Sequence, residues 1–349
     1  MRALITGVSG FCGSHLAQLL LEKGFEVAGL VREETKLESA QDVLDRVRIF
    51  KGDVRRQDSI VTCLSRVQPH RVYHLAALTS ENDSGGCYKD LYETNVQGTI
   101  NLLESVRALG IDPVIHIACS SAEYGLVTPD ECPITEQSAF RPLTHYAVSK
   151  VAQDMLGYQY SIRFGLKIVR TRAFNIVGPR QSDRFVCSTL ARQVAEIEEG
   201  FIEPLIRVGN LTSRRDFVDV RDAVRGYWLV SEQGENGQVY NVCSGQAWSI
   251  RQVLDMLLRL TEVDIRVEHE AQRVRRHEIP IQIGDCSKLS QQTGWRPAID
   301  LGKTLQDLLD FWRQRTREGN PALKKQAFSY CQAGGARHRS PPSRPTERS

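Results

Sequence analysis

The stretch TGVSGFCG, residues 6–13, decides the fold. It places Gly7, Gly10 and Gly13 in a GxxGxxG spacing, between a short apolar strand and the helical run SHLAQLLLEKG. Glycine suits this turn because the tight backbone and the close approach of a pyrophosphate leave no room for a Cβ atom. The N–H groups at the start of the next helix would then bind the phosphates. A glycine triplet that follows a strand and opens a helix predicts a dinucleotide-binding turn.

Strand-like and helix-like segments alternate from this turn to residue 121. The strand-like segments that follow are FEVAGLV, VRIFKGDV, RVYHLAA and PVIHIACSS. Alternation of this kind implies right-handed crossovers and a parallel sheet with helices on both faces. We therefore predict an α/β fold with a Rossmann-type doubly wound parallel sheet in the first half of the chain.

The composition is that of a globular protein with a basic end. The chain has 349 residues, 41% of them hydrophobic and 25% charged, and a net charge of +3. Six Lys and Arg residues but one acidic residue lie beyond residue 323, so the rest of the chain is slightly acidic. We expect residues 318–349, rich in Ser, Pro, Gly and Arg, to form a basic disordered tail. The acidic body argues against a nucleic-acid-binding surface.

Nine cysteines are scattered along the chain without a CxxC pair or a His cluster at metal-binding spacing. Reduced thiols in a cytoplasmic protein are the simplest explanation, and we predict no metal site. The apolar part of MRALITG is too short for a signal peptide, and no run of about 18 apolar residues occurs. We therefore expect no membrane span.

Two side chains bear on the choice of dinucleotide. Arg32, in LVREET, stands where NAD enzymes usually carry an acid for the ribose 2′-hydroxyl, and an arginine suits a 2′-phosphate. This favours NADP(H), with NAD(H) as the alternative because two glutamates follow directly. Asp53, in KGDV, is placed to accept a hydrogen bond from an adenine amino group, or else is an exposed turn residue.

The stretch THYAVSK carries a candidate proton donor. Tyr146 and Lys150 are four residues apart, so on a helix they share a face about one turn apart. An ammonium near a phenol lowers the pKa of the phenol from about 10. A tyrosine that transfers protons needs such a partner.

Further motifs carry a resemblance to a known family. They are GDV, HLAA, SSAEYG, YAVSK, RAFNIVGPRQ, GNLTSRRDFVDVRD, YNVCSG and TGWRP. With the glycine turn, they resemble the extended short-chain dehydrogenase/reductases that act on nucleotide sugars, over roughly residues 1–315. The chain is most similar to the GDP-mannose branch, which contains 4,6-dehydratases and 4-keto-6-deoxy-mannose reductases. The resemblance implies an NAD(P)-binding domain at 1–172 and 211–246, and a smaller α/β sugar-nucleotide-binding domain at 173–210 and 247–317.

The same resemblance assigns further residues. Those implied at the cofactor, besides the glycines, Arg32, Asp53, Tyr146 and Lys150, are Phe11, Val54, Leu75, Ala76 and Ala77. Those implied at the substrate are Asn175, Arg180, Arg215, Arg275 and Glu278. Asn175 and Arg215 match positions that hold the diphosphate, while Arg275 and Glu278 match a stretch that contacts diphosphate and nucleoside. The family's usual proline after Arg275 is absent here, which leaves the choice of base open.

Glu123 is the ambiguous candidate among the catalytic residues. Family members carry the catalytic Ser or Thr four residues before the Tyr of a YG pair, and this position is Ser120. In the dehydratases a proton-transferring glutamate stands two residues after it, where this chain has Ala122. On this register Glu123 only resembles the acid and contacts substrate or solvent instead. A register with Ser121 as the catalytic hydroxyl would restore Glu123 as the acid.

The resemblance implies a reductase in which Tyr146 donates the proton, Ser120 hydrogen-bonds the same oxygen, and Lys150 lowers the pKa of Tyr146 and holds the nicotinamide ribose. We predict NADP(H)-dependent reduction of the C4 ketone of a GDP-linked 4-keto-6-deoxy hexose, with a product such as GDP-rhamnose. The alternatives are a GDP-mannose 4,6-dehydratase and, less favoured, a 4-epimerase. A non-catalytic dinucleotide-binding protein would have no use for the intact catalytic set. The resemblance also implies a homodimer, or a dimer of dimers, through the Tyr146 helix and the helix at 91–109.

Overall fold

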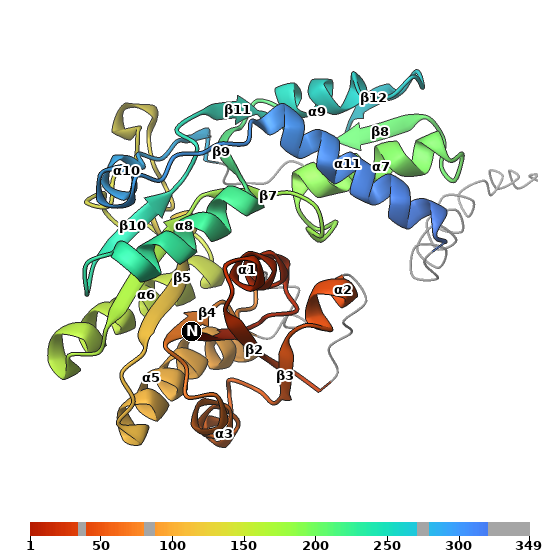
Figure 1. The fold of residues 1–349 in the computed structure, drawn as a ribbon. Coiled ribbons are helices and arrows are strands. Elements are labelled where there is room, and N and C mark those ends of the chain that lie inside the picture. Colours follow the sequence, from red (N-terminus) through yellow and green to blue (C-terminus); the bar gives the residue numbers. More distant parts are fainter. Residues whose placement is uncertain (34–39, 80–87, 271–278, 320–349) are drawn as a thin grey trace, which may run out of the picture.

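A computed structural model of the chain describes residues 1–33, 40–79, 88–270 and 279–319 (Figure 1). Its larger sheet has seven parallel strands in the order β10-β6-β5-β4-β1-β2-β3. These are β1 (Arg2–Thr6), β2 (Glu26–Val31), β3 (Arg48–Lys51), β4 (Arg71–His74), β5 (Val114–Ser120), β6 (Ile168–Ala173) and β10 (Val239–Val242). The chain runs outward from β1 to β3 and then from β4 to β10 on the other side. The predicted Rossmann-type doubly wound sheet is therefore confirmed.

Helices cover both faces of this sheet. One face carries α1 (Phe11–Glu22), α2 (Gln41–Leu44) and α8 (Val220–Gln233), and the other carries α3 (Gln57–Val67), α5 (Gly98–Leu109) and α6 (His145–Phe164). Successive strand residues point to opposite faces, so Ile5 packs with the first group and Leu4 with the second. Burial on both sides explains why the strands are continuously apolar.

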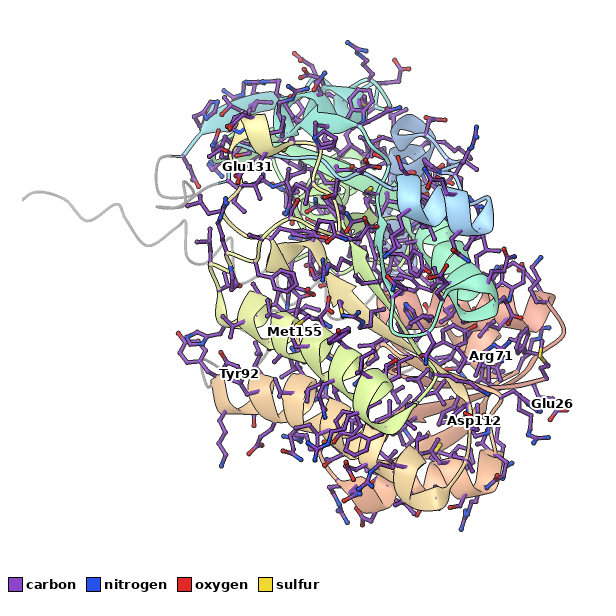
Figure 2. The ribbon with its side chains drawn as sticks, turned by 90° about the vertical axis from the view of Figure 1, so that its left-hand side faces the viewer. Glu26, Arg71, Tyr92, Asp112, Glu131 and Met155 are labelled. Carbon is purple, nitrogen blue, oxygen red and sulfur yellow. The ribbon has the colours of Figure 1, made fainter. Side chains whose placement is uncertain are left out.

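The predicted helix at 91–109 is built from three pieces. They are α4 (Tyr88–Tyr92), a π-helical turn at Glu93–Gln97, and α5. Buried Asn95 in the π-helical turn accepts the N–H of Leu78 at 2.8 Å and donates to its carbonyl at 3.0 Å. Figure 2 shows this segment, marked by Tyr92, beside α6, which carries Met155. The π-helical turn thus ties the loop after β4 to the helix pair at this surface.

The rest of the chain forms a smaller α/β part, which confirms the second half of the fold prediction. A four-stranded sheet contains β7 (Asn175–Val177), β9 (Arg214–Asp219), β11 (Ala247–Ser249) and β13 (Ile281–Gln282), and β8 (Leu205–Val208) pairs with β12 (Arg266–His269). A separate apolar core joins α7 (Val186–Glu198), α9 (Ile250–Leu258) and α11 (Leu301–Arg317).

Two elements pack with a different part of the structure from the one that the predicted domain ranges give them. Strand β9 lies inside the range 211–246 but pairs with β7, β11 and β13 of the smaller part. Conversely, α10 (Ser287–Thr293) lies inside 247–317, yet Leu289 and Trp295 are buried in the core under α1 and α8. The chain crosses between the two parts at more places than the motifs suggest.

Two further expectations concern a membrane span and the basic tail. In the described ranges no helix is both long and apolar enough to cross a membrane. The predicted tail lies outside the described residues, apart from its first two positions, 318 and 319.

Candidate active site

The glycine turn lies between β1 and α1, as the sequence predicts. Gly7 has a φ of +73°, and a Cβ there would lie 2.9 Å from the Cα of Ala76. A Cβ on Gly13 would overlap the carbonyl oxygen of Gly7. Gly10 is the N-cap of α1 and supplies no side-chain hydrogen bond. The backbone N–H groups of the first helical turn are therefore available to a phosphate, as a dinucleotide requires.

A cavity of about 300 Å³ opens beside this turn, at the carboxyl ends of β1, β2 and β4. Eight predicted cofactor residues line it: Gly7, Gly10, Arg32, Asp53, Val54, Leu75, Ala76 and Ala77. Ser9, Leu30, Val31, Gly52, Leu78 and Thr94 also line it and were missed. Most of these residues lie next to predicted positions. The carboxyl ends of the predicted strands could therefore have indicated them. The lining and the turn fit a dinucleotide.

Phe11 and Gly13 have other contacts in this structure. The Phe11 ring packs edge-on to His15 at 5.8 Å and borders the core between sheet and helix. Gly13 lets α1 approach the turn closely, as the overlap of its hypothetical Cβ shows. Neither residue is among those that line the cavity.

Charged side chains meet at the β2 and β3 side of the cavity. Arg32 is exposed, and its charge helps to lower the pKa of Asp53. Burial raises that pKa, but the hydrogen bonds from Arg55 outweigh it: the backbone N–H lies 2.9 Å and Nη2 2.7 Å from the carboxylate. Asp53 therefore already has a protein partner, and its predicted contact with adenine stays a prediction.

The structure brings the three predicted catalytic residues together. Ser120 ends β5, while Tyr146 and Lys150 lie in the first turns of α6, which begins after the Thr144 N-cap. A side-chain hydrogen bond joins Ser120 to Tyr146. Lys150 Nζ donates to the carbonyl of Ala118 at 2.8 Å and lies 5.9 Å from the centre of the Tyr146 ring. This arrangement can deliver a proton and hold an oxyanion at one point.

The expected depression of the Tyr146 pKa is wrong for this structure. Burial raises the pKa to about 12, and the hydrogen bond from Ser120 offsets only part of that rise. The Lys150 ammonium is itself buried, which lowers its pKa, and it is directed to the Ala118 carbonyl. Tyr146 is therefore fully protonated at neutral pH.

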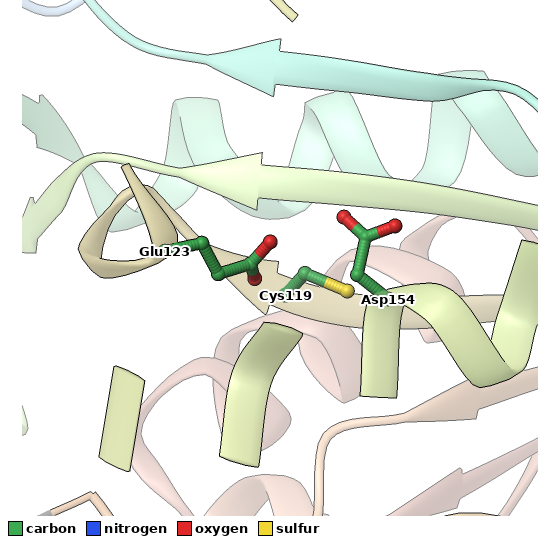
Figure 3. Close-up of side chains that lie close together, drawn as sticks. All are labelled: Cys119, Glu123 and Asp154. Atoms are coloured by element: carbon green, nitrogen blue, oxygen red, sulfur yellow. The ribbon is translucent and has the colours of Figure 1, made fainter. Parts of the chain in front are cut away.

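Glu123 points into the protein, so the expectation that it contacts solvent is wrong. Residues Ser121–Glu123 form a 3₁₀ turn, and the Glu123 side chain is 0% exposed. Its Oε1 accepts the N–H of Ser120 at 2.8 Å. Figure 3 shows its carboxylate beside Cys119 and Asp154. Two guanidinium groups share this cluster, which makes it a poor site for a cation.

A sequence signal for this geometry was present but missed. The pattern Ser120-Ser-Ala-Glu123 is a capping box. In it the Ser120 side chain accepts a backbone N–H of the turn, and the Glu123 side chain accepts the backbone N–H of Ser120. The Ser120 side chain accepts the N–H of Ala122 at 3.2 Å. The pattern predicts an inward-turned glutamate better than alternation along a strand does.

The structure describes three of the five residues predicted at the substrate. Asn175 in β7 donates to the carbonyl of Asp216 at 2.9 Å, and Arg215 lies on β9, which pairs with β7. Arg180 is held against α1, where its Nη2 donates to Gln18 Oε1 at 3.1 Å. The structure thus puts Asn175 and Arg215 on neighbouring strands. The remaining candidates, Arg275 and Glu278, lie outside the described residues.

Comparisons with known proteins show which family the chain matches. The family model for GDP-mannose 4,6 dehydratase matches residues 4–308. GDP-6-deoxy-D-mannose reductase of Pseudomonas aeruginosa is 32% identical and aligns over 91% of this chain and 99% of its own. GDP-mannose 4,6-dehydratase of Vibrio cholerae is 28% identical over 94% of this chain and 97% of its own.

A solved structure shares the fold over most of the chain. The structure of RMD from Pseudomonas aeruginosa complexed with NADPH superimposes with a TM-score of 0.78 at 32% identity. The match covers 90% of this chain and 99% of that one.

Proposed function

The chain belongs to the GDP-mannose branch of the extended short-chain dehydrogenase/reductases, the family of the GDP-mannose 4,6-dehydratases, and we propose that it is a reductase. Its reaction is the NADP(H)-dependent reduction of the C4 ketone of a GDP-linked 4-keto-6-deoxy hexose. The product is a sugar nucleotide such as GDP-rhamnose.

One observation carries the choice of reductase over dehydratase. Loss of water between C5 and C6 needs an acid at the sugar, beside the Ser120–Tyr146 pair. The turn after β5 offers Ala122 at the dehydratase position, and Glu123, its acidic residue, is 0% exposed and bonded to the Ser120 N–H. Reduction of a ketone needs a proton donor but no second acid. The turn therefore suits a reductase.

The residues divide the reaction between them. When bound, the nicotinamide supplies the hydride for C4. Tyr146, protonated at neutral pH, donates the proton to the developing alkoxide. Ser120 hydrogen-bonds the same oxygen, and a donor of this kind is worth about 10²-fold or more in rate. Lys150 stands beside Tyr146 to hold the nicotinamide ribose, and Asn175 and Arg215 serve the diphosphate region.

The choice of NADP(H) rests on Arg32 and on the relative with bound NADPH. Arg32 is exposed at the mouth of the cavity, where a guanidinium can pair with a 2′-phosphate. The superimposed Pseudomonas aeruginosa structure contains NADPH. We also place the protein in the cytoplasm, because the cysteines within the described ranges are all free thiols.

Two incubations test the proposed reaction. Purified protein with GDP-4-keto-6-deoxy-mannose should consume NADPH mole for mole, and faster than NADH at equal concentration. GDP-mannose should remain unchanged with or without NADPH. Formation of a 4-keto-6-deoxy sugar from GDP-mannose without net cofactor consumption would instead identify a dehydratase. Interconversion at C4 without net consumption would identify an epimerase.

The assembly that we propose is a homodimer through α6 and the segment from α4 to α5. Exposed apolar side chains recur every seven residues along α6, at Val148, Met155 and Ile162, and Ile162 is 67% exposed. A stripe of this period on a helix is typical of helix-to-helix packing. Figure 2 shows Met155 on α6 with the Tyr92 segment alongside, so two copies can form a four-helix interface.

Charging this stripe should split the dimer. We expect Met155→Arg to halve the molar mass measured by sedimentation equilibrium, because a buried unpaired charge opposes association. The control is Phe201→Arg, since Phe201 is 50% exposed but lies after α7 in the smaller part. A Met155→Arg protein with the same mass as the wild type would exclude this interface.

A further inference from the structure

Glu123 is the centre of a buried charged cluster behind the catalytic residues. Its Oε1 accepts the Ser120 N–H, and its carboxylate lies within 4.8 Å of the ligand atoms of Asp154 and Cys119 (Figure 3). Asp154 is on α6, one turn after Lys150, and it is also 0% exposed. The pair therefore connects the turn carrying Ser120 to the helix carrying Tyr146.

The hydrogens around this pair can be assigned from the contacts. Arg172 Nε has one hydrogen, which it donates to Asp154 Oδ2 at 2.7 Å. Arg170 Nη1 bonds the other carboxylate oxygen of Asp154. Arg172 Nε also lies 3.3 Å from Glu123 Oε2, yet Oε2 receives no donor and is fully buried. Each Asp154 oxygen thus has one donor and can accept a further one, whereas Glu123 Oε2 is left without a donor.

Two carboxylates cannot hydrogen-bond to each other unless one of them carries a proton. Asp154 is paired with two guanidinium groups, so Glu123 is the group that takes the proton. Burial, followed by the charge of Asp154, raises the pKa of Glu123 well above its ordinary value, while Arg172 lowers it only in part. With the proton on Oε2, Glu123 donates a hydrogen bond to Asp154, and Oε2 no longer lacks a partner.

We propose that Glu123 is a positioning residue that works as a neutral carboxylic acid. Its Oε1 fixes the Ser120 backbone, and its Oε2–H donates to Asp154, so that Ser120 and Tyr146 are held in register. The neutral form also leaves the cluster of Arg170, Arg172 and Asp154 net positive behind the site where the alkoxide forms. This inference rests on the proposed reductase, because it assigns Glu123 no proton transfer to the sugar.

The test compares two substitutions at Glu123. Glu123→Gln keeps an acceptor for Ser120 and gains an N–H for Asp154, so we expect kcat and KM for ketone reduction near the wild-type values. Glu123→Leu keeps the volume but neither bond, and we expect kcat to fall about 10²-fold at nearly unchanged KM for the keto sugar. A glutamine variant as slow as the leucine variant would overturn the proposal, as would a leucine variant with wild-type kcat.

A stability measurement gives a readout that does not depend on activity. The folded protein holds a proton on Glu123 that the unfolded chain releases above about pH 4.5, so this group stabilises less as pH rises. The melting temperature of Glu123→Gln relative to wild type should therefore rise with pH. If wild type fails to reduce the keto sugar, this measurement still tests the neutral carboxyl. A relative melting temperature that stays level or falls with pH would overturn it.

Glu131 is the matched control, because it forms another capping box, with Thr128, on an exposed turn and not in the buried cluster. Hydrogen bonds from Arg141 lower the pKa of Glu131 to about 2, so this carboxylate stabilises the fold when it is charged. Glu131→Gln should therefore lower the melting temperature at neutral pH, lose that effect toward about pH 2, and leave kcat unchanged.

Discussion

Replacing Tyr146 by phenylalanine is expected to lower kcat for ketone reduction by about 10²–10⁴-fold, with little change in NADPH affinity. The phenylalanine keeps the ring in the first turn of α6 but removes the oxygen that bonds Ser120. Hydride addition at C4 requires that the developing alkoxide is protonated, and the phenol of Tyr146 is the proposed source of that proton. Steady-state rates with the keto sugar and a separate NADPH titration measure the two quantities.

The pH dependence follows from the raised pKa of Tyr146. Reduction needs the protonated phenol, and burial holds the pKa at about 12. The wild-type rate constant for reduction should therefore stay level through neutral and mildly alkaline pH, whereas the reverse oxidation, which needs the phenolate, should rise with pH. A reduction rate that falls near pH 7 would mean that another group donates the proton.

Tyr160→Phe is the matched control for this substitution. Tyr160 lies on the same helix, and its hydroxyl donates to Glu104 at 2.7 Å, away from the catalytic residues. Its loss should leave kcat unchanged. If Tyr146→Phe were no slower than Tyr160→Phe, Tyr146 would have no part in the proton transfer.

The features that could be predicted from the sequence are those set by neighbours along the chain. Gly7, Gly10 and Gly13 occupy one turn, and their spacing alone fixes how strand, turn and helix must pass a phosphate. Tyr146 and Lys150 share one helix face because they are four residues apart. Short-range geometry of this kind hardly depends on the rest of the fold.

The features that the sequence missed depend on residues far apart in the chain. The capping-box contact of Glu123 is local, but the charged cluster around its carboxylate is made by Asp154 and Arg172, which come from α6 and β6. The pKa of Tyr146 is set by burial, which no local pattern reports. Strand β9 belongs to the smaller part and not to the domain predicted for it, because it pairs with β7 and β11, which come from distant parts of the chain. Tertiary contacts override local rules where charge is buried.

Removing the Arg172 guanidinium is expected to cause the largest loss of stability. Arg172 is 3% exposed and donates to Asp154 at 2.7 Å, to Tyr124 Oη at 3.0 Å and to the Glu136 carbonyl at 3.0 Å. Arg172→Met keeps an apolar stem but removes the arginine's donors from all three acceptors, and it leaves Asp154 with Arg170 alone. Breaking a buried ion pair from one side costs about 3–5 kcal/mol. Denaturant unfolding followed by circular dichroism measures the change.

Two further variants separate the causes of that loss. Arg172→Lys keeps the charge, but one ammonium cannot reach all three acceptors in the arginine's planar geometry, so an intermediate loss is expected. Arg56→Met removes an exposed partner of Asp58 and should leave stability unchanged. If Arg172→Met were as mild as Arg56→Met, Arg170 and entering water would have to satisfy Asp154 in its place. Glu123 would stay neutral in that variant, because Arg172 is the charged neighbour that lowers its pKa.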